Sequence, residues 1–283
     1  MLKFCNLELY ILKVEFSNLK GKWAFLNGAN IHSSKQAVFS ILFRSISPLY
    51  NPLQANIFAE YNGANNETGL FSSFQFKLNP RWKASYFIDF YSKQHHPFRL
   101  EPKIRGEEYF CKIEHIWSKK NNMYIRSQFK RKQNLNSDFS ALDYLNYQHQ
   151  FKLRWHANYQ IEDFYFQSRV QYNYVNSSSG NLFFQQISYQ PLSTSYSLKL
   201  RYIVFNTPEF SSRIYAYEPD VLYSFSVPAY YGIGKAIVAV LKYKLPHNIS
   251  AYFKWRVVFE DSELIYTNKD VSHQLKCLIK WKF

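Results

Sequence analysis

Basic side chains recur at alternate positions along this 283-residue chain, where they could attract anions. Lysine and arginine number 35 against 20 aspartate and glutamate residues, a formal net charge of +15 at pH 7. If these side chains line the water-filled interior of a β-barrel, their charges would favour anionic solutes. The alternative is that they only solvate a filled polar interior. The candidate lumen-facing residues are Arg126, Lys130, Lys152, Arg154, Arg169, Lys199, Arg201, Lys254, Arg256, Lys276 and Lys280.

No group of residues has the spacing of a catalytic, metal or cofactor site. Ser272–His273 lacks a nucleophile turn, oxyanion donors and a group that would fix the histidine tautomer. A metal on His95–His96 would need further ligands, and the acidic stretch 260–270 lacks the spacing of a calcium loop. Glycine-rich phosphate motifs are also absent. We therefore expect no enzyme activity, no metal and no cofactor.

The three cysteines, Cys5, Cys111 and Cys277, form no CxxC pair. Cys111 and Cys277 both fall among apolar residues of alternating segments. We interpret them as small hydrophobic side chains rather than as metal ligands or nucleophiles.

Alternation of apolar and polar residues with period two dominates the chain and predicts β-strands. Within 145–160, apolar residues take the odd positions and polar residues the even ones, and only His149 interrupts the pattern. The same alternation occurs in 82–90, 123–129, 164–174, 196–204 and 253–259. A helical period would mix the two faces, so the pattern predicts an all-β fold of about seventeen strands.

The expected connections alternate between short and long. Tight turns are predicted at 79–80, 119–122, 160–163, 190–193 and 246–248. Longer polar links are predicted at 62–68, 93–106, 133–143, 176–180 and 260–272. Bacterial outer-membrane barrels have short periplasmic turns and long extracellular loops. If Phe283 lies on the periplasmic side, every long link falls outside, which predicts a transmembrane antiparallel up-and-down β-barrel.

The last strand carries a further signal. On one face lie Leu275, Cys277, Ile279, Trp281 and Phe283, and the other face is mainly polar. A final strand that alternates in this way and stops on an aromatic residue resembles the closing strand of a bacterial outer-membrane barrel. The resemblance implies that these five residues form a membrane-insertion signal read by the barrel-assembly machinery.

Composition agrees with a membrane location but the amino terminus is unusual. Aromatic residues make up 20% of the chain, as in the aromatic belts of membrane interfaces, and no apolar run has the length of a membrane-spanning helix. Residues 1–16 contain five polar or charged side chains and no apolar export signal. We therefore expect residues 1–283 to be one barrel domain, incomplete at its amino terminus and the carboxyl-terminal part of a longer protein.

Three segments extend the resemblance to a family. They are 213–232 (RIYAYEPDVLYSFSVPAYYG), 47–52 (SPLYNP) and 65–70 (NNETGL). They resemble the barrel region of a poorly characterised group of Gram-negative outer-membrane proteins, often described as helix-hairpin-helix-containing after small DNA-binding-type modules upstream of the barrel. The resemblance covers essentially the whole chain, and those modules have no counterpart in it.

Two functional hypotheses follow. The first is an outer-membrane β-barrel in contact with membrane lipid, acting as a pore, transport or scaffold component of the cell envelope. The second is a surface module that binds or takes up DNA or another polyanion, as the net charge and the family resemblance suggest. A soluble basic β-protein is disfavoured, because monomers rarely expose such large apolar faces.

Overall fold

The computed structural model of the chain describes residues 6–10, 14–16, 23–50, 58–61, 66–93, 103–135, 145–191, 194–260 and 270–281. Within these ranges the regular structure is β-strand, apart from the 3-10 turn η1 (Phe210–Ser212). No helix in the described part is long and apolar enough to cross a membrane. The strands are β1 (Asn6–Tyr10), β2 (Val14–Phe16), β3 (Trp23–His32), β4 (Ala37–Ile46), β5 (Glu67–Lys77), β6 (Trp82–Lys93), β7 (Ile104–Ile116), β8 (Asn122–Leu135), β9 (Leu145–Ile161), β10 (Phe164–Val175), β11 (Ser178–Tyr189), β12 (Tyr196–Thr207), β13 (Ile214–Tyr215), β14 (Ala229–Tyr230), β15 (Gly232–Lys244), β16 (Ile249–Glu260) and β17 (Asp270–Trp281).

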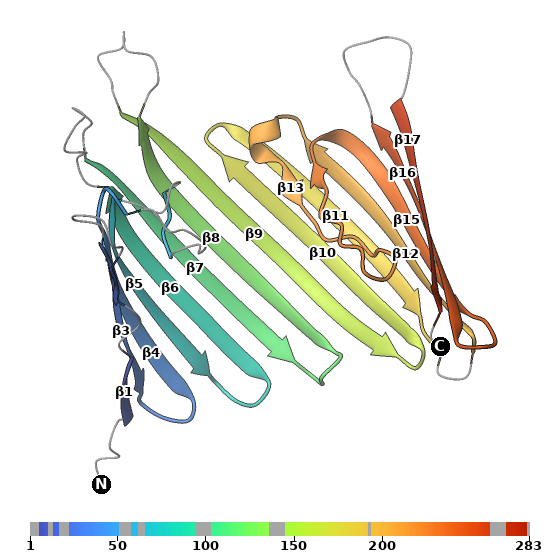
Figure 1. Cartoon of the computed structure of the whole chain (residues 1–283), viewed down its shortest axis with the longest axis horizontal. Helices are drawn as coiled ribbons and strands as arrows, with labels where there is room; N and C mark the ends of the chain where they lie inside the picture. Colours follow the sequence, from blue (N-terminus) through green and yellow to red (C-terminus); the bar gives the residue numbers. More distant parts are fainter. Residues whose placement is uncertain are drawn as a thin grey trace. The chain divides into compact units, whose positions relative to one another are not determined.

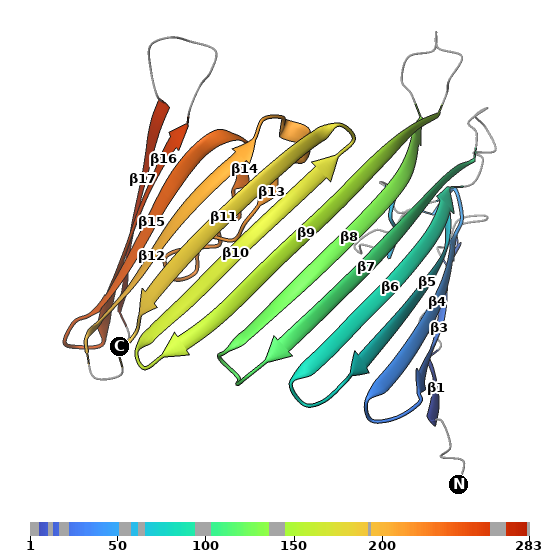
Figure 2. The same cartoon turned by 180° about the vertical axis from the view of Figure 1, so that it is seen from behind.

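Strands that follow one another in the sequence are neighbours in a sheet of 15 strands (Figures 1 and 2). The exception is β12, which pairs with β15 because β13 and β14 pair with each other. Strands β1 and β2 pair with successive stretches of β3, so that they share one position beside it. In the described part of the chain β1 and β17 stand at the two ends of this order. The predicted all-β, antiparallel up-and-down order is confirmed, and its closure into a transmembrane barrel stays a prediction.

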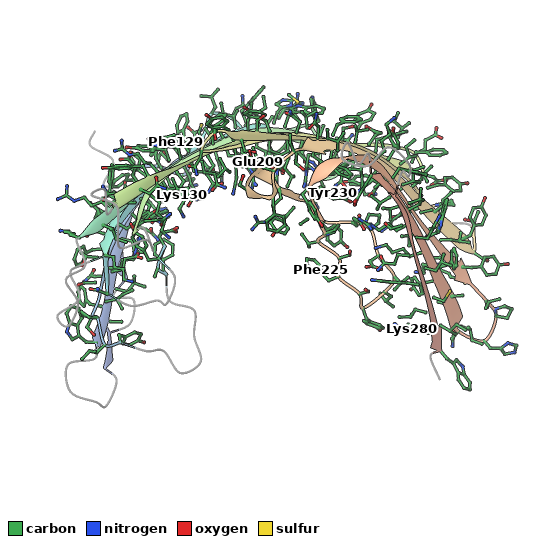
Figure 3. The ribbon with its side chains drawn as sticks, turned by 90° about the horizontal axis from the view of Figure 1, so that it is seen from above. Phe129, Lys130, Glu209, Phe225, Tyr230 and Lys280 are labelled. Atoms are coloured by element: carbon green, nitrogen blue, oxygen red, sulfur yellow. The ribbon has the colours of Figure 1, made fainter. Side chains whose placement is uncertain are left out.

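The chain forms two compact units. The first contains residues 1–114 and 126–151, and the second contains residues 115–125 and 152–283. In the first unit Arg44, Glu67 and Asp89 are buried on what we call the polar face of the sheet. The other face, the aromatic face, exposes Phe39, Phe43, Leu70, Phe74, Phe90, Phe129 and Tyr147. Strand pleating separates the two sets, as Phe129 and Lys130 on opposite sides of β8 illustrate (Figure 3).

The second unit repeats this division. Its polar face buries Gln171, Asn173, Gln186, Arg201 and Lys254. Its aromatic face exposes Tyr159, Phe164, Val170, Phe183, Leu198, Leu200, Tyr202, Phe253, Trp255, Leu275, Ile279 and Trp281. Charged residues are almost never fully buried in soluble proteins unless they are paired, and large apolar rings are usually covered. Both units therefore distribute their side chains in the reverse of the soluble pattern.

Residues 208–231, which we call the inner segment, cover part of the polar face of the second unit. The segment includes η1, β13 and β14 and lies against β10 to β12 in both views (Figures 1 and 2). Its Ile214, Ala216 and Tyr230 are buried with Phe184 and Val238 of the strands. The largest hydrophobic cluster of the described residues thus forms where the inner segment meets the sheet.

The predicted tight turns at 79–80, 119–122, 160–163 and 246–248 join successive strands as expected, and residues 192–193 of the fifth lie outside the described residues. The structure adds a further short connection between β3 and β4, and a long one, the inner segment, between β12 and β15. The connections 94–102, 136–144 and 261–269 lie outside the described residues.

The predicted long link at 176–180 is wrong. Val175 pairs with Ser178, so that only two residues connect β10 to β11. Asn176 has a φ of 56°, the left-handed conformation that asparagine tolerates in tight turns. Gly180 belongs to β11, where a Cβ atom would lie 2.6 Å from the carbonyl oxygen of Ser212. The glycine therefore permits close approach of the inner segment rather than marking a loop tip.

Candidate functional site

Two buried carboxylates of the inner segment meet the basic residues of β16 and β17. Glu218 is held by an isolated bridge to Ser226, with its N–H 2.9 Å from the Ser226 carbonyl oxygen. Its side chain is fully buried. One carboxylate oxygen accepts hydrogen bonds from Arg256 Nε at 2.9 Å and from the Tyr230 hydroxyl, and the other lies 3.4 Å from Lys254 Nζ. The charge of Glu218 is thus shared by two cations.

Asp220 makes the second half of this cluster. Its Oδ2 lies 2.9 Å from Lys276 Nζ and 3.2 Å from Lys254 Nζ, and its Oδ1 accepts the N–H of Val221 at 2.8 Å. Burial raises the pKa of Asp220, but the hydrogen bonds from Lys276, Val221 and Lys254 outweigh burial and hold that pKa below its ordinary value. The aspartate is therefore charged at neutral pH.

Arg201 fixes the inner segment without a carboxylate. Its guanidinium donates to the side-chain oxygen of Gln186 at 2.6 and 2.9 Å and to that of Gln167 at 2.8 Å. It also donates to the backbone carbonyl of Tyr217. The Arg201 Cζ atom lies 4.0 Å from the ring centroid of Phe184, a cation–π geometry. Arg201 is thus satisfied by neutral partners although it is only 2% exposed.

Further contacts hold other parts of the segment. Lys280 donates to the Tyr223 hydroxyl at 2.9 Å, and Asn173 donates to the Arg213 carbonyl at 3.0 Å. Five of the eleven basic residues predicted from the sequence therefore hold the inner segment on the polar face. They are Arg201, Lys254, Arg256, Lys276 and Lys280.

The other six also lie on polar faces and are at least half covered. Lys130 pairs with Glu60 and lies 3.4 Å from Glu108. Arg154 Nε donates to Gln171 at 2.7 Å, and Arg169 Nε donates to His156 Nδ1 at 3.3 Å. The remaining three are Arg126, Lys152 and Lys199. That the eleven residues line a lumen stays a prediction.

The first unit contains a charge cluster that the sequence reasoning missed. The fully buried Arg44 lies 2.7 Å from Glu67 and forms a two-pronged pair with Asp89 at 2.8 and 3.0 Å. Gly69 pairs with Arg44 across the strands, and a Cβ atom there would lie 2.4 Å from the Arg44 guanidinium carbon. Glycine at this position therefore makes room for the guanidinium.

Glu67 also orders the chain that precedes β5. Its carboxylate accepts the backbone N–H of Glu60 and of Tyr61, both at 2.9 Å. Burial, and then the charge of Glu67, raise the pKa of the Tyr61 hydroxyl above its ordinary value. Glu60 in turn pairs with Lys130, so that one network joins Arg44 to β8.

The missed residues carried some signal in the sequence. Glu218 and Asp220 belong to the Tyr-Glu-Pro-Asp stretch of segment 213–232, one of the segments that carry the family resemblance. Glu67 and Asp89 occupy the polar positions of alternating strands. Acidic residues on a face rich in lysine and arginine indicate ion pairing, but the partners become evident only from the strand register.

A pocket of about 360 Å³ opens on the second unit beside these clusters. Lys199, Lys242 and Lys244 line it together with Ser195 and Ser197. Asp220 is the acidic residue of the lining, and its carboxylate is already bound by two lysines. The pocket thus combines ammonium and hydroxyl groups, which suit an anion.

No set of three or more His, Cys, Asp or Glu side chains in the described ranges could hold a metal ion. His95–His96 and most of the acidic stretch 260–270 lie outside those ranges. Cys277 is exposed and Cys111 is half-buried, both as free thiols, whereas Cys5 lies outside the described residues.

The predicted insertion signal is placed in part. Leu275, Ile279 and Trp281 are 64–77% exposed on the same face as Cys277. Phe283 lies outside the described residues. The role of these residues in membrane insertion stays a prediction.

Comparisons with known proteins add little to this geometry. No protein-family model matches the chain, and no curated protein does. Among solved structures, the chain is similar to CdiB from Acinetobacter baumannii, with a TM-score of 0.42 and 11% sequence identity. The match covers 92% of this chain and 50% of CdiB, so the chain spans about half the length of that protein. Similarity at this level carries no functional argument.

Glu218→Gln is expected to loosen the inner segment. Neutralising one member of a buried ion pair leaves the charges of Lys254 and Arg256 less compensated, which costs about 3 kcal/mol. We expect faster protease cleavage within residues 208–231 and a lower urea midpoint in detergent. Glu209→Gln is the matched control, because Glu209 is exposed on the same segment (Figure 3). Equal cleavage rates in the two variants would contradict the anchoring role of Glu218.

Proposed function

We propose that this chain forms an outer-membrane β-barrel of a Gram-negative bacterium, with a role as a pore, transport or scaffold component of the envelope. The observation that supports this proposal is the reversed distribution of side chains. Exposed aromatic and aliphatic residues follow the strands on one face, while buried charges and amides fill the other. A membrane barrel has an apolar face toward lipid and a polar face toward its interior.

The inner segment would narrow the lumen of such a barrel. It lies on the polar face, which would face the lumen, and its contacts there are both apolar and ionic. A segment held inside a barrel narrows the path for solutes. We therefore favour a constricted pore or transport role in which membrane lipid contacts the aromatic face and the barrel-assembly machinery inserts the chain.

Cys277 provides a direct test of the membrane location. In a Cys5→Ser, Cys111→Ser background, Cys277 is the single thiol and lies exposed on the aromatic face of β17. In folded protein inserted into lipid vesicles, we expect a water-soluble maleimide to fail to label it. A thiol in lipid neither meets the charged reagent nor ionises to the reactive thiolate. Urea-unfolded protein should be labelled by the same reagent.

A matched control places the thiol in water. Lys119→Cys in a Cys277→Ser version of the same background lies in the exposed turn between β7 and β8. This thiol should react with the water-soluble maleimide in vesicles. Electrophoresis with and without boiling should in addition show a heat-modifiable folded form. Equal labelling of the two thiols by the water-soluble reagent would contradict the proposed membrane location.

The constriction makes a separate prediction about conductance. Glu218→Gln should raise the single-channel conductance in planar bilayers relative to the natural sequence, because a loosened inner segment obstructs less of the lumen. Glu209→Gln should leave the conductance unchanged. A conductance that is the same in all three proteins would show that the inner segment does not limit the pore.

A second candidate function is the binding of DNA or another polyanion. The lysine-lined pocket of the second unit favours it, as does the resemblance to proteins with upstream DNA-binding-type modules. Arg201 and Arg256 are engaged by the inner segment, so Lys199 and Lys242 are the better candidates for phosphate contacts. Such contacts are electrostatic and weaken steeply with added salt.

Lys199→Gln with Lys242→Gln tests this second function. We would measure binding to a short DNA duplex at several salt concentrations. The slope of the logarithm of the binding constant against the logarithm of the salt concentration should decrease in magnitude by about 0.9 for each phosphate contact removed. Lys235→Gln is the control, because Lys235 is exposed on β15 on the opposite face from Lys242. Binding by the double variant that equals binding by the control would exclude these lysines as the polyanion site.

A further inference from the structure

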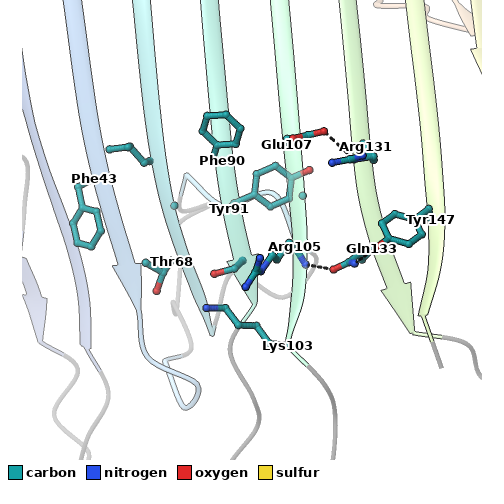
Figure 4. Close-up of a pocket in the computed structure, with 14 residues that line it drawn as sticks. Phe43, Thr68, Phe90, Tyr91, Lys103, Arg105, Glu107, Arg131, Gln133 and Tyr147 are labelled. Atoms are coloured by element: carbon teal, nitrogen blue, oxygen red, sulfur yellow. Dashed lines mark hydrogen bonds and ion pairs between the residues drawn. The ribbon is translucent and has the colours of Figure 1, made fainter. Parts of the chain in front are cut away.

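A pocket of about 560 Å³ lies on the first unit, at the ends of its strands where the long connections begin (Figure 4). Residues at the start of β5, β7 and β9 and at the end of β4, β6 and β8 line it. Because neighbouring strands are antiparallel, these residues all lie at the same end of the strands. The tight turns after β5 and β7 lie at the opposite end of the strands.

The apolar walls of the pocket belong to the aromatic face. Phe43, Leu70, Phe90 and Tyr147 line it and are 41–48% exposed. Side chains at these positions point away from the buried Arg44 cluster, since neighbouring residues of a strand alternate between faces. The pocket therefore opens on the side of the sheet that the proposed function turns toward lipid.

Three basic side chains line the pocket beside these apolar residues. Lys103 and Arg105 line the pocket, and neither forms an ion pair within the described part of the chain. Arg131 is the third, and its Nε lies 2.8 Å from Glu107, the acidic residue of the lining. One carboxylate thus faces three positive charges, and the pocket keeps an excess of positive charge.

Hydrogen bonds fix the wall and the cations relative to each other. Gln133 accepts the backbone N–H of Arg105 at 2.8 Å and donates to the Tyr147 hydroxyl at 2.7 Å. One glutamine therefore links β7 to β9 across β8. An arginine backbone and an aromatic wall held by the same side chain give the pocket a defined geometry (Figure 4).

We propose that this pocket binds a phosphate-bearing anionic lipid of the surrounding membrane. The phosphate contacts Lys103 and Arg105, and an acyl chain lies along Phe43, Leu70 and Phe90. Arginine and lysine bind phosphate through charge-assisted hydrogen bonds, and apolar surface beside them accommodates the chain. The inference rests on the proposed function, because only a membrane-embedded aromatic face would meet lipid at this site.

The test compares three probes on protein folded in detergent micelles. Native mass spectrometry would measure binding of dioleoyl phosphatidic acid, dioleoyl phosphatidylcholine and inorganic phosphate. We expect a clear preference for phosphatidic acid, and about a tenfold loss of that affinity in Lys103→Gln/Arg105→Gln, since lost charge-assisted hydrogen bonds contribute on this scale. Arg81→Gln is the control, because Arg81 is exposed at the opposite, tight-turn edge of β5 and β6.

Leu70→Ala separates the two parts of the ligand. This substitution should weaken the binding of phosphatidic acid without changing the binding of inorganic phosphate. Full competition by inorganic phosphate at equal concentration would overturn the lipid assignment in favour of a simple anion site. Equal binding of phosphatidylcholine would overturn it in favour of nonspecific lipid contact. If the double variant does not fold, Lys103→Gln alone is measured, with a severalfold loss expected and no loss counting against the site.

Failure of this inference is distinguishable from failure of the proposed function. Heat-modifiable mobility reports folding of the same detergent preparation, and protection of Cys277 reports membrane insertion after its transfer into vesicles. Intact insertion without preference for phosphatidic acid would reject the lipid site alone. Preference for phosphatidic acid in a protein whose Cys277 reacts with the water-soluble maleimide would reject the membrane proposal instead.

Discussion

A charge that leaves water must meet an opposite charge or several hydrogen-bond partners, and this requirement organises both units. In the first unit Arg44 is satisfied by Glu67 and Asp89, which lie on the next two strands. In the second, Lys254 meets Glu218 and Asp220, which reach it from a connection rather than from a strand. Because charged side chains occupy one face and residues alternate along each strand, the aromatic rings have only the other face. The exposed aromatic surface is thus a consequence of the buried charge, and a lipid environment accommodates both.

Much of this architecture was predictable from local pattern. Period two identifies the strands, and residues such as Asn248 and Pro80 mark their turns. The contacts of Glu218 were not predictable, because they join positions 36 and 38 residues apart through the path of the inner segment over the sheet, which no local pattern encodes. The turn at Asn176 was missed for a related reason. Serines around Gly180 suggest a loop by composition, whereas the close approach of Ser212 explains why a glycine stands in that strand.

The net positive charge of the chain is unevenly compensated. Around the inner segment, acidic residues meet most of the cations, so a count of lysine and arginine overstates the positive potential of that region. Lysine and arginine side chains also gather in two pockets. One is the pocket of Lys199 and Lys242, on a polar face. The other is the pocket of Lys103 and Arg105, beside apolar walls on an aromatic face. Phosphate chemistry suits both pockets, but the neighbouring surface differs, so water-soluble anions suit the first and lipids the second.

Magnitudes indicate which contacts hold the inner segment and which position it. Ile214 is fully buried, and burial of such a side chain contributes about 1.5–3 kcal/mol. A buried ion pair gains little net free energy, because desolvation of both charges offsets their attraction. The apolar contacts of Ile214, Ala216 and Tyr230 therefore supply most of the binding free energy of the segment. The ionic contacts of Glu218 and Asp220 fix the position of the segment, since a small shift that kept Lys254 covered would leave this charge without a partner. A segment attached in this way is stable in one place and costly to displace by a small shift, which is the property that a fixed constriction requires.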